Sequence, residues 1–233
     1  MNTRRKIVFA LGASALAASF APFAQQPAKI ARIGYLSPSS PSSEAGSARY
    51  EAFRQGLREL GYTEGKNVII ELRWADGKYE RLPELAAELV RVKVDIIVTY
   101  GTPGTAAAKQ ATSTIPIVMA TSGDPVSTGL IASLARPGGM ITGSTIYIPE
   151  LMAKRLELLK QVKPRAKQMA ALVNADDPSR LPVLKAMETA ARSLKVSLQK
   201  FEVRGRQDIE NAFTAMGKSH IDAVVAQEDP MIS

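Results

Sequence analysis

The sequence contains no cysteine and a single histidine, His220, among its 233 residues. The absence of cysteine excludes disulfides, thiolate-ligated zinc and cysteine catalysis. One histidine is too few for a His-based metal site. Because His220 precedes an apolar run, we interpret it as a loop residue rather than as a metal ligand or a member of a Ser-His-Asp triad. From these residue types we expect no metal and no cofactor.

Known enzyme motifs are also missing. The stretch Gly101-Thr102-Pro103-Gly104 fits neither a dinucleotide-binding G-x-G-x-x-G loop nor a Walker A loop. No G-x-S-x-G nucleophile motif occurs. The adjacent carboxylates Asp176 and Asp177 suit a metal or an acid pair, but at a predicted strand end we interpret them as solvated. We therefore predict no catalytic residue and a protein that is not an enzyme.

Positive charge is in surplus but is not concentrated. Lys and Arg number 30 against 22 Asp and Glu, which gives a formal net charge of +8. A nucleic-acid-binding surface gathers basic residues on one face with aromatic residues between them. Here basic and acidic residues are interspersed, so we interpret the charge as a solvated surface and expect no nucleic-acid partner.

The first 24 residues have the layout of a secretory signal peptide. Residues 1–6 carry three consecutive basic residues, residues 7–23 form an uncharged apolar stretch, and Ala21 and Ala24 offer cleavage positions. The alternative is an uncleaved membrane anchor, because an apolar stretch of this length can span a bilayer. Since Pro22 closes the segment where an anchor would continue, we predict cleavage and a periplasmic mature protein.

Beyond this leader, short β-branched runs alternate with longer segments of helical periodicity. This alternation predicts an α/β fold of parallel sheets with helices on both faces. The predicted strands span residues 30–36, 67–74, 94–100, 115–120, 141–146, 168–174, 195–203 and 221–225. The predicted helices span residues 44–60, 82–92, 105–111, 127–134, 149–162, 181–194 and 207–217. Because the pattern breaks near Pro149, we predict two lobes, residues 25–147 and 148–233.

Polar residues follow most of the predicted strands. In open parallel sheets, ligands bind beyond the carboxyl ends of the strands, where helix N-termini offer N–H groups to anions. Asp124 or Asp229 is a candidate partner for a ligand ammonium. Any single polar residue after a strand is equally well explained as a helix cap or turn residue. The candidate ligand-binding residues are Ser37, Gly101, Thr102, Thr121, Ser122, Asp124, Asn174 and Asp229.

Trp74 ends a predicted strand and has two interpretations. Its ring can stack on an aromatic ligand, or it can be partly buried packing. We favour packing, because that is the commoner role of such a residue.

Several ordered blocks of the sequence match one known family. They are residues 53–62 (FRQGLRELGY), 71–75 (ELRWA), 81–90 (RLPELAAELV), 101–103 (GTP), 111–118 (ATSTIPIV), 123–126 (GDPV) and 133–139 (SLARPGG). Together they resemble the ABC transporter substrate-binding family that includes tryptophan- and tyrosine-binding proteins, from about Ile30 to Pro230. The resemblance implies a periplasmic-binding-protein-like fold, a small ligand such as an amino acid or related organic acid, and a membrane permease with its ATPase as partners. It implies binding at the strand-end loops already named, and we expect a monomer.

The sequence departs from this family in two ways. It has no lipobox cysteine, so lipid anchoring is not expected. It also ends at Ser233, where family members continue, complete the second lobe and return to the first. We therefore expect an incomplete second lobe, exposed sheet edges, lower stability than in a full-length relative and weak binding.

The mechanism that this resemblance implies is capture by hinge closure. Two lobes rotate toward each other and enclose the solute, as an extracytoplasmic component of an ABC importer does. An exported ligand-sensing domain of the same fold is one alternative, and an exported α/β enzyme is a less favoured one.

Overall fold

The computed structural model describes residues 30–229, 231 and 232, and its helices and strands all lie in one compact unit, Ala31–Ser233. The predicted signal peptide, residues 1–24, lies outside the described residues. No helix in the described part of the chain is long and apolar enough to cross a membrane.

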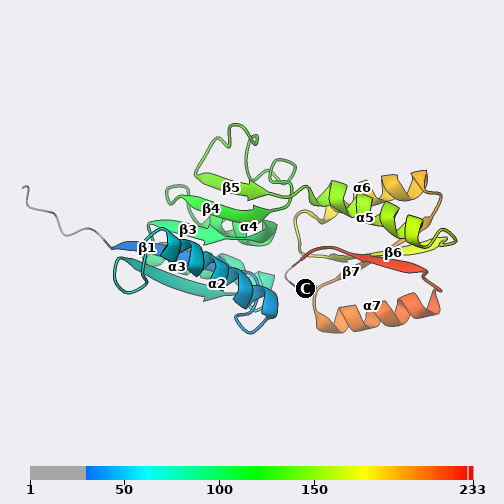
Figure 1. Cartoon of the computed structure of the whole chain (residues 1–233), viewed down its shortest axis with the longest axis horizontal. Coiled ribbons are helices and arrows are strands. Elements are labelled where there is room, and N and C mark those ends of the chain that lie inside the picture. Colours follow the sequence, from blue (N-terminus) through cyan, green and yellow to red (C-terminus); the bar gives the residue numbers. More distant parts are fainter. Residues whose placement is uncertain (1–29, 230, 233) are drawn as a thin grey trace, which may run out of the picture. The chain divides into compact units, whose positions relative to one another are not determined.

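The N-terminal half of the described chain forms a five-stranded parallel sheet (Figure 1). Its strands occur in the order β2-β1-β3-β4-β5, so that β3 is the middle strand. Helices α2, α3 and α4, with the short 3₁₀ helix η1, connect the first four strands. The bounds are β1 Ala31–Ser37, α2 Glu44–Glu59, β2 Val68–Trp74, η1 Tyr79–Arg81, α3 Leu82–Arg91, β3 Ile96–Thr99, α4 Gly101–Ala111, β4 Ile117–Ser122 and β5 Ile141–Thr145.

The C-terminal half forms a three-stranded parallel sheet in the order β7-β6-β8. Helices α5 and α6 cover one face of this sheet and α7 covers the other (Figure 1). The bounds are α5 Ile148–Val162, β6 Gln168–Asn174, α6 Arg180–Ser193, β7 Ser197–Val203, α7 Arg206–Lys218 and β8 Ala223–Ala226. The predicted α/β architecture with parallel sheets is therefore confirmed.

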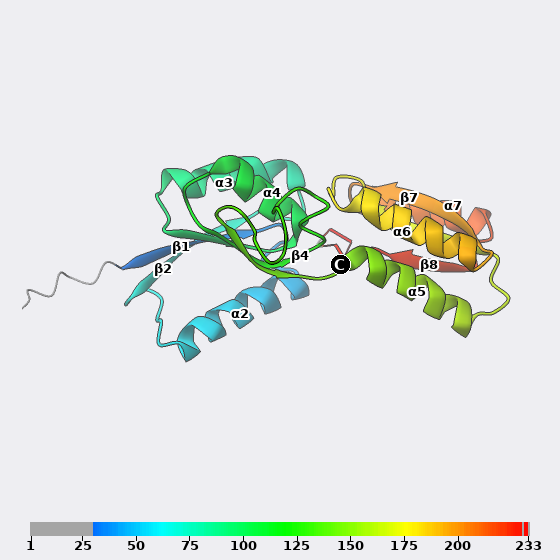
Figure 2. The same ribbon diagram turned by 90° about the horizontal axis from the view of Figure 1, so that it is seen from above.

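Helices cover both faces of the first sheet. Figure 2 shows α3 and α4 on one side of the sheet and α2 on the other. On the α3 side, Leu82, Leu85, Ala86 and Leu89 are buried at i, i+3, i+4 and i+7, the spacing of one helix face. Burial of each leucine of this kind stabilises the fold by roughly 1.5–3 kcal/mol.

Two residues that bear on the fold, Gly143 and His220, have a positive φ. Gly143 in β5 has a φ of +140°, and a Cβ there would lie 1.9 Å from the carbonyl oxygen of Met119 in β4. Only glycine allows β5 to pair with β4 in this way. At the end of α7, His220 has a φ of +51° and lies in a turn, which confirms its interpretation as a loop residue.

The segment that follows β4 corrects one helix prediction. Residues 127–134 form turns and bends rather than the predicted helix. The segment begins as a helix would, because the Asp124 carboxylate accepts hydrogen bonds from the backbone N–H groups of Val126 and Ser127. Gly129 then adopts a φ of +70°, which no right-handed helix continues through.

The start of α4 corrects another prediction. Residues 101–104, predicted as a loop, form the first turn of the helix. Pro103 is compatible with this turn because the N–H that proline lacks has no partner there in any α-helix. As a result, one residue, Tyr100, connects β3 to α4.

Candidate ligand-binding site

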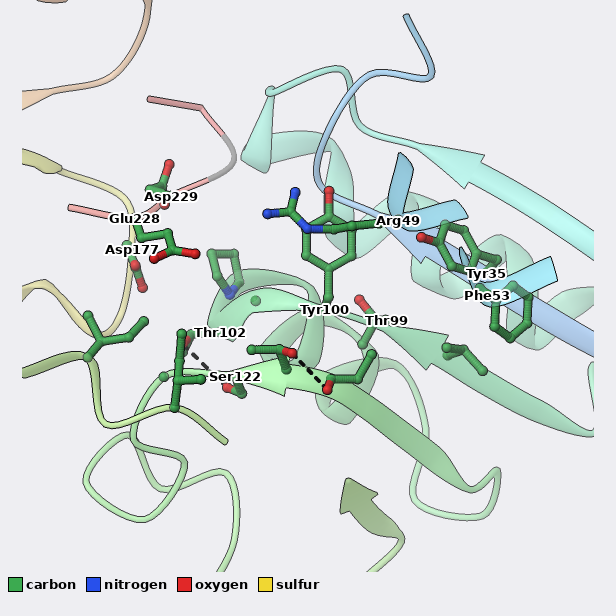
Figure 3. A pocket seen from close by; sticks show the side chains of 18 of the residues that line it. Tyr35, Arg49, Phe53, Thr99, Tyr100, Thr102, Ser122, Asp177, Glu228 and Asp229 are labelled. Atoms are coloured by element: carbon green, nitrogen blue, oxygen red, sulfur yellow. Dashed lines mark hydrogen bonds between the residues drawn. The ribbon is translucent and has the colours of Figure 1, made fainter. Parts of the chain in front are cut away.

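A cavity of about 430 Å³ lies at the carboxyl ends of strands from both sheets (Figure 3). Its walls come from β1, α2, the β3–α4 junction, the end of β4, the segment between β5 and α5, and the segments after β6 and β8. A volume of this size suits a small organic molecule. Several of the polar residues that follow strands therefore lie around this one cavity.

The first turn of α4 forms one wall. Gly101 and Thr102 line the cavity, and in the described chain no side chain caps the backbone N–H groups that follow Tyr100. These groups carry the partial positive charge of a helix N-terminus and suit an anion or a carbonyl oxygen. Thr102 Oγ1 lies 3.4 Å from Ser122 Oγ at the end of β4, so the two hydroxyls flank the helix start together.

Thr99, the last residue of β3, has a buried hydroxyl that lines the same wall. Its Oγ1 atom is buried and has no hydrogen-bond partner among the described residues. A Cβ at position 104 would lie 2.3 Å from this oxygen, so Gly104 is what allows α4 to pack this closely against β3. A buried hydroxyl without a partner costs free energy unless a ligand or water supplies one.

An aromatic wall lies beside α2. Tyr35 and Phe53 line the cavity with ring centroids 5.2 Å apart, and burial raises the pKa of Tyr35 well above its ordinary value. Tyr50 and Trp74 pack behind them, with centroids 5.2 and 5.8 Å from that of Tyr35. Trp74 is half-buried and is not part of the cavity lining, which agrees with its interpretation as packing.

Arg49 projects from α2 across this wall. Its guanidinium carbon lies 4.7 Å from the centroid of the Tyr100 ring, a cation–π distance. Figure 3 shows the guanidinium crossing that ring, with three carboxyl side chains on the other side of the cavity. The Arg49 Nη1 atom is buried and has no hydrogen-bond partner within the described chain.

Two serine side chains contact the Tyr100 hydroxyl and hold the ring in place. Its Oη atom donates a short hydrogen bond to Ser39 Oγ and lies 3.4 Å from Ser37 Oγ. Ser37 is fully buried and positions Tyr100 rather than lining the cavity.

Asp177, after β6, is one of the carboxylates on the opposite wall. Its oxygens accept hydrogen bonds from the Ser179 backbone N–H at 2.8 Å, the Ser179 hydroxyl at 2.8 Å and Gln227 Nε2 at 2.6 Å. Burial nevertheless raises the pKa of Asp177 to about 6, because it disfavours the charged form more than these donors stabilise it.

Asp229, after β8, is a second buried carboxylate with donors of its own. It accepts hydrogen bonds from Tyr79 Oη at 3.0 Å, from Asn174 Nδ2 at 3.1 Å and from the Met231 backbone N–H at 2.8 Å. Burial is the main cause of its raised pKa. Because Tyr79 precedes α3, this contact joins the two sheets through one hydrogen bond.

The predicted site residues divide into three groups. Five of them line the cavity together: Gly101, Thr102, Thr121, Ser122 and Asp229. Ser37 and Asn174 are buried directly behind it, where they contact Tyr100 and Asp229. Asp124 does not line this cavity and instead caps the turn that follows β4.

The expectation that ligands bind beyond the carboxyl ends of the strands missed several residues of the cavity wall. Thr99 and Asp177 do follow or end strands and were within its reach, whereas Tyr35, Arg49 and Phe53 lie inside β1 and α2. The interpretation of Asp176 and Asp177 as solvated is right for the exposed Asp176 and wrong for Asp177, which is 6% exposed.

Comparisons with known proteins agree with this architecture. The family model described as ABC transporter substrate binding protein matches residues 41–233. The tyrosine-binding protein of Clostridioides difficile (strain R20291) is 28% identical over 183 residues, which are 78% of this chain and 52% of that protein.

Two solved structures are similar in fold and in sequence. The ABC domain in complex with L-Trp from Streptococcus pneumonia is 26% identical with a TM-score of 0.78, over 87% of this chain and 66% of that one. A conserved domain protein from Vibrio cholerae O1 biovar eltor is 26% identical with a TM-score of 0.77, over 84% of this chain and 64% of that one.

The likeness extends to the leucine-binding protein of Thermotoga maritima, at 15% identity and a TM-score of 0.63, which bears on the fold alone. The periplasmic-binding-protein-like fold predicted from the sequence is thereby confirmed. The chain spans about half the length of the curated relative and about two thirds of the first two solved chains. On the strength of the family match, the chain belongs to the ABC transporter substrate-binding protein family.

Proposed function

We propose that this chain is the extracytoplasmic substrate-binding component of an ABC importer, which holds a small organic solute without reacting with it. The observation that carries the proposal is the cavity, whose walls come from the strand ends of both sheets in a member of this family. The relatives named for tyrosine and solved with L-Trp support an amino acid or a related organic acid as the solute.

The residues proposed to contact the solute are those that line the cavity at the start of α4 and the end of β4. Gly101 and Thr102 offer backbone N–H groups and a hydroxyl, and Thr121 and Ser122 add polar groups from β4. Asp229, which lines the wall that follows β8, is also proposed to belong to the site. Ser37 and Asn174 are proposed to act indirectly, by positioning Tyr100 and Asp229, and Asp124 has no place in the proposed site.

Capture is proposed to occur by closure of two lobes, residues 25–147 and 148–233, around the solute. Because the chain has no cysteine, Glu84→Cys on α3 and Asn211→Cys on α7 place two spectroscopic labels, both at exposed positions. Addition of solute is expected to shorten and narrow the distance distribution between the labels. An unchanged distribution with bound solute would exclude closure.

The binding proposal is tested by a thermal-shift screen of amino acids, organic acids, amines and sugars on the protein without its leader. A solute at 100 times its dissociation constant stabilises the folded state by about 2.7 kcal/mol. For a domain of this size that corresponds to a rise in Tm of about 5–10 °C. Mass spectrometry of the recovered solute must show it unaltered, since turnover would favour an enzyme instead.

The importer role is tested with the permease and ATPase in proteoliposomes. Uptake of the identified solute is expected only when this protein is present in the outer compartment. Binding without any effect on uptake would favour an exported sensor, and location in the periplasm is checked by fractionation of the expressing cell.

A further inference from the structure

The charged side chains of the cavity wall differ in how well the protein itself satisfies them. Among the described residues, four charged side chains line the cavity: Arg49, Asp177, Glu228 and Asp229. Asp177 and Asp229 each accept at least three hydrogen bonds from protein donors. Glu228 pairs with Arg155 Nη2 at 3.1 Å. Within the described part of the chain, each carboxylate of this acidic wall therefore already has a protein partner before a ligand ammonium arrives.

The wall formed by α2 and the β3–α4 junction has hydrogen-bond donors without acceptors. The Nη1 atom of Arg49 and the hydroxyl of Thr99 are buried and have no partner in the described chain. The first turn of α4, a few residues from Thr99, adds backbone N–H groups that no side chain caps. A negatively charged acceptor would satisfy each of these groups, and the Arg49 guanidinium gains most from one because the hydrogen bond is charge-assisted.

The same helix also supplies an apolar surface. Arg49 and Phe53 are four residues apart on α2, so they lie on one face of the helix and both line the cavity. Tyr35 lies beside Phe53, with ring centroids 5.2 Å apart. A ligand that meets Arg49 with its anionic group therefore places its body against aromatic rings.

We propose that this site selects a small organic anion with a ring-bearing apolar body over the corresponding zwitterion, and that Arg49, assisted by Thr99, sets this preference. The proposal rests on the proposed function and narrows its solute class. A zwitterion brings an ammonium that must lose its water against a wall whose carboxylates already accept hydrogen bonds from the protein, so its desolvation is compensated only in part. A monoanion of the same size carries no such cost.

The test compares three molecules that share a phenylpropyl skeleton: 3-phenylpropanoate, L-phenylalanine and 3-phenylpropan-1-ol. Dissociation constants are measured by calorimetry for the wild type, Arg49→Gln, Thr99→Val and the control Arg54→Gln. Arg54 is on the same helix but pairs with Glu51 and Glu64 outside the cavity. We expect the wild type to bind 3-phenylpropanoate about tenfold or more tightly than either other compound.

The variants separate a binding role from a structural one. Arg49→Gln is expected to weaken 3-phenylpropanoate binding by about 10–100-fold and to leave the alcohol within about threefold. Thr99→Val removes a buried hydroxyl without a partner, so the melting temperature of the free protein is expected to stay the same or rise while anion binding weakens several-fold. The control Arg54→Gln is expected to change neither anion binding nor the melting temperature.

Three results would overturn the inference. They are tighter binding of L-phenylalanine than of 3-phenylpropanoate, an equal effect of Arg49→Gln on all three compounds, or a lower melting temperature of Thr99→Val with anion binding unchanged. If none of the three compounds binds, the compound that stabilises the protein most in the thermal-shift screen is used instead. A cationic, zwitterionic or neutral compound in that place would overturn the inference while the proposed function stands. If no compound of any class stabilises the protein, the proposed function itself is refuted.

Discussion

Asp177 is expected to make the stability of this protein decrease as the pH rises from acid to neutral. Burial raises the pKa of this carboxyl to about 6 in the folded protein, against 3.8 for the unperturbed group. Because the folded state holds the proton more tightly than the unfolded state, the stabilisation is fully present below pH 3.8 and is lost as the pH rises through about 6.

The magnitude follows from the size of the shift. At about 1.4 kcal/mol for each pKa unit, the full effect is about 3 kcal/mol, and the part between about pH 4.5 and about pH 7.5 is about 2 kcal/mol. The Asp177 side chain is almost completely buried, so solvent does not screen the effect away. Asp229 is buried nearby and its pKa is raised in the same direction.

The assay is urea unfolding of the wild type and Asp177→Asn at those two pH values. Asparagine cannot accept all the hydrogen bonds that Asp177 receives, so the variant carries a constant loss that does not depend on pH. The informative quantity is the free energy of unfolding of the variant minus that of the wild type. It is expected to rise by about 2 kcal/mol between about pH 4.5 and about pH 7.5. A difference that stays constant, or that falls, would refute this account of Asp177.

Four further substitutions test other parts of the structure, each by urea unfolding. Gly143→Ala is expected to destabilise the protein by about 2 kcal/mol or more, because of its φ and the carbonyl oxygen in its way, whereas Gly56→Ala, in open space on α2, is expected to stabilise by up to about 1 kcal/mol; equal effects would contradict the geometry. Tyr79→Phe removes one donor from the buried Asp229 and is expected to cost about 1–3 kcal/mol, and a neutral result would show that this hydrogen bond is not formed in solution. Asp222→Asn is expected to show the opposite pH dependence to Asp177→Asn. The backbone N–H groups of residues 168 and 167 lower the pKa of Asp222, so its stabilising effect is present above pH 3.8 and is lost as the pH falls below that value. A loss relative to the wild type that is as large at about pH 2.5 as at about pH 6 would contradict this.

The sequence predicted the strands best where burial is most complete. β6 matches its predicted bounds, Gln168–Asn174, because six of its seven residues are buried and its apolar run has no competing interpretation. The predicted helix at residues 127–134 failed for a local reason, since Gly129 adopts a backbone conformation that sequence periodicity does not reveal. Periodicity describes side-chain placement and is insensitive to a single residue with positive φ.

The site was predictable only where it follows the strands. Thr102 and Ser122 were found because the carboxyl ends of neighbouring parallel strands meet at one edge. Arg49 was not found, because a lone arginine on an amphipathic helix has the pattern of a solvated residue. Asp177 differs from its neighbour Asp176 through a contact with Gln227, 50 residues later, and no local pattern contains that information.

The one-residue junction between β3 and α4 has a consequence for efforts to change the affinity of this protein. The backbone amides at the start of α4 are joined through one residue to the middle strand of their sheet, so we expect them to be restrained before a solute binds. Stiffening this wall further would gain nothing, because little freedom remains there to lose on association. In the proposed complex the long side chain of Arg49 loses rotational freedom on binding the solute, so substitutions that restrict it beforehand are the more productive route to tighter binding.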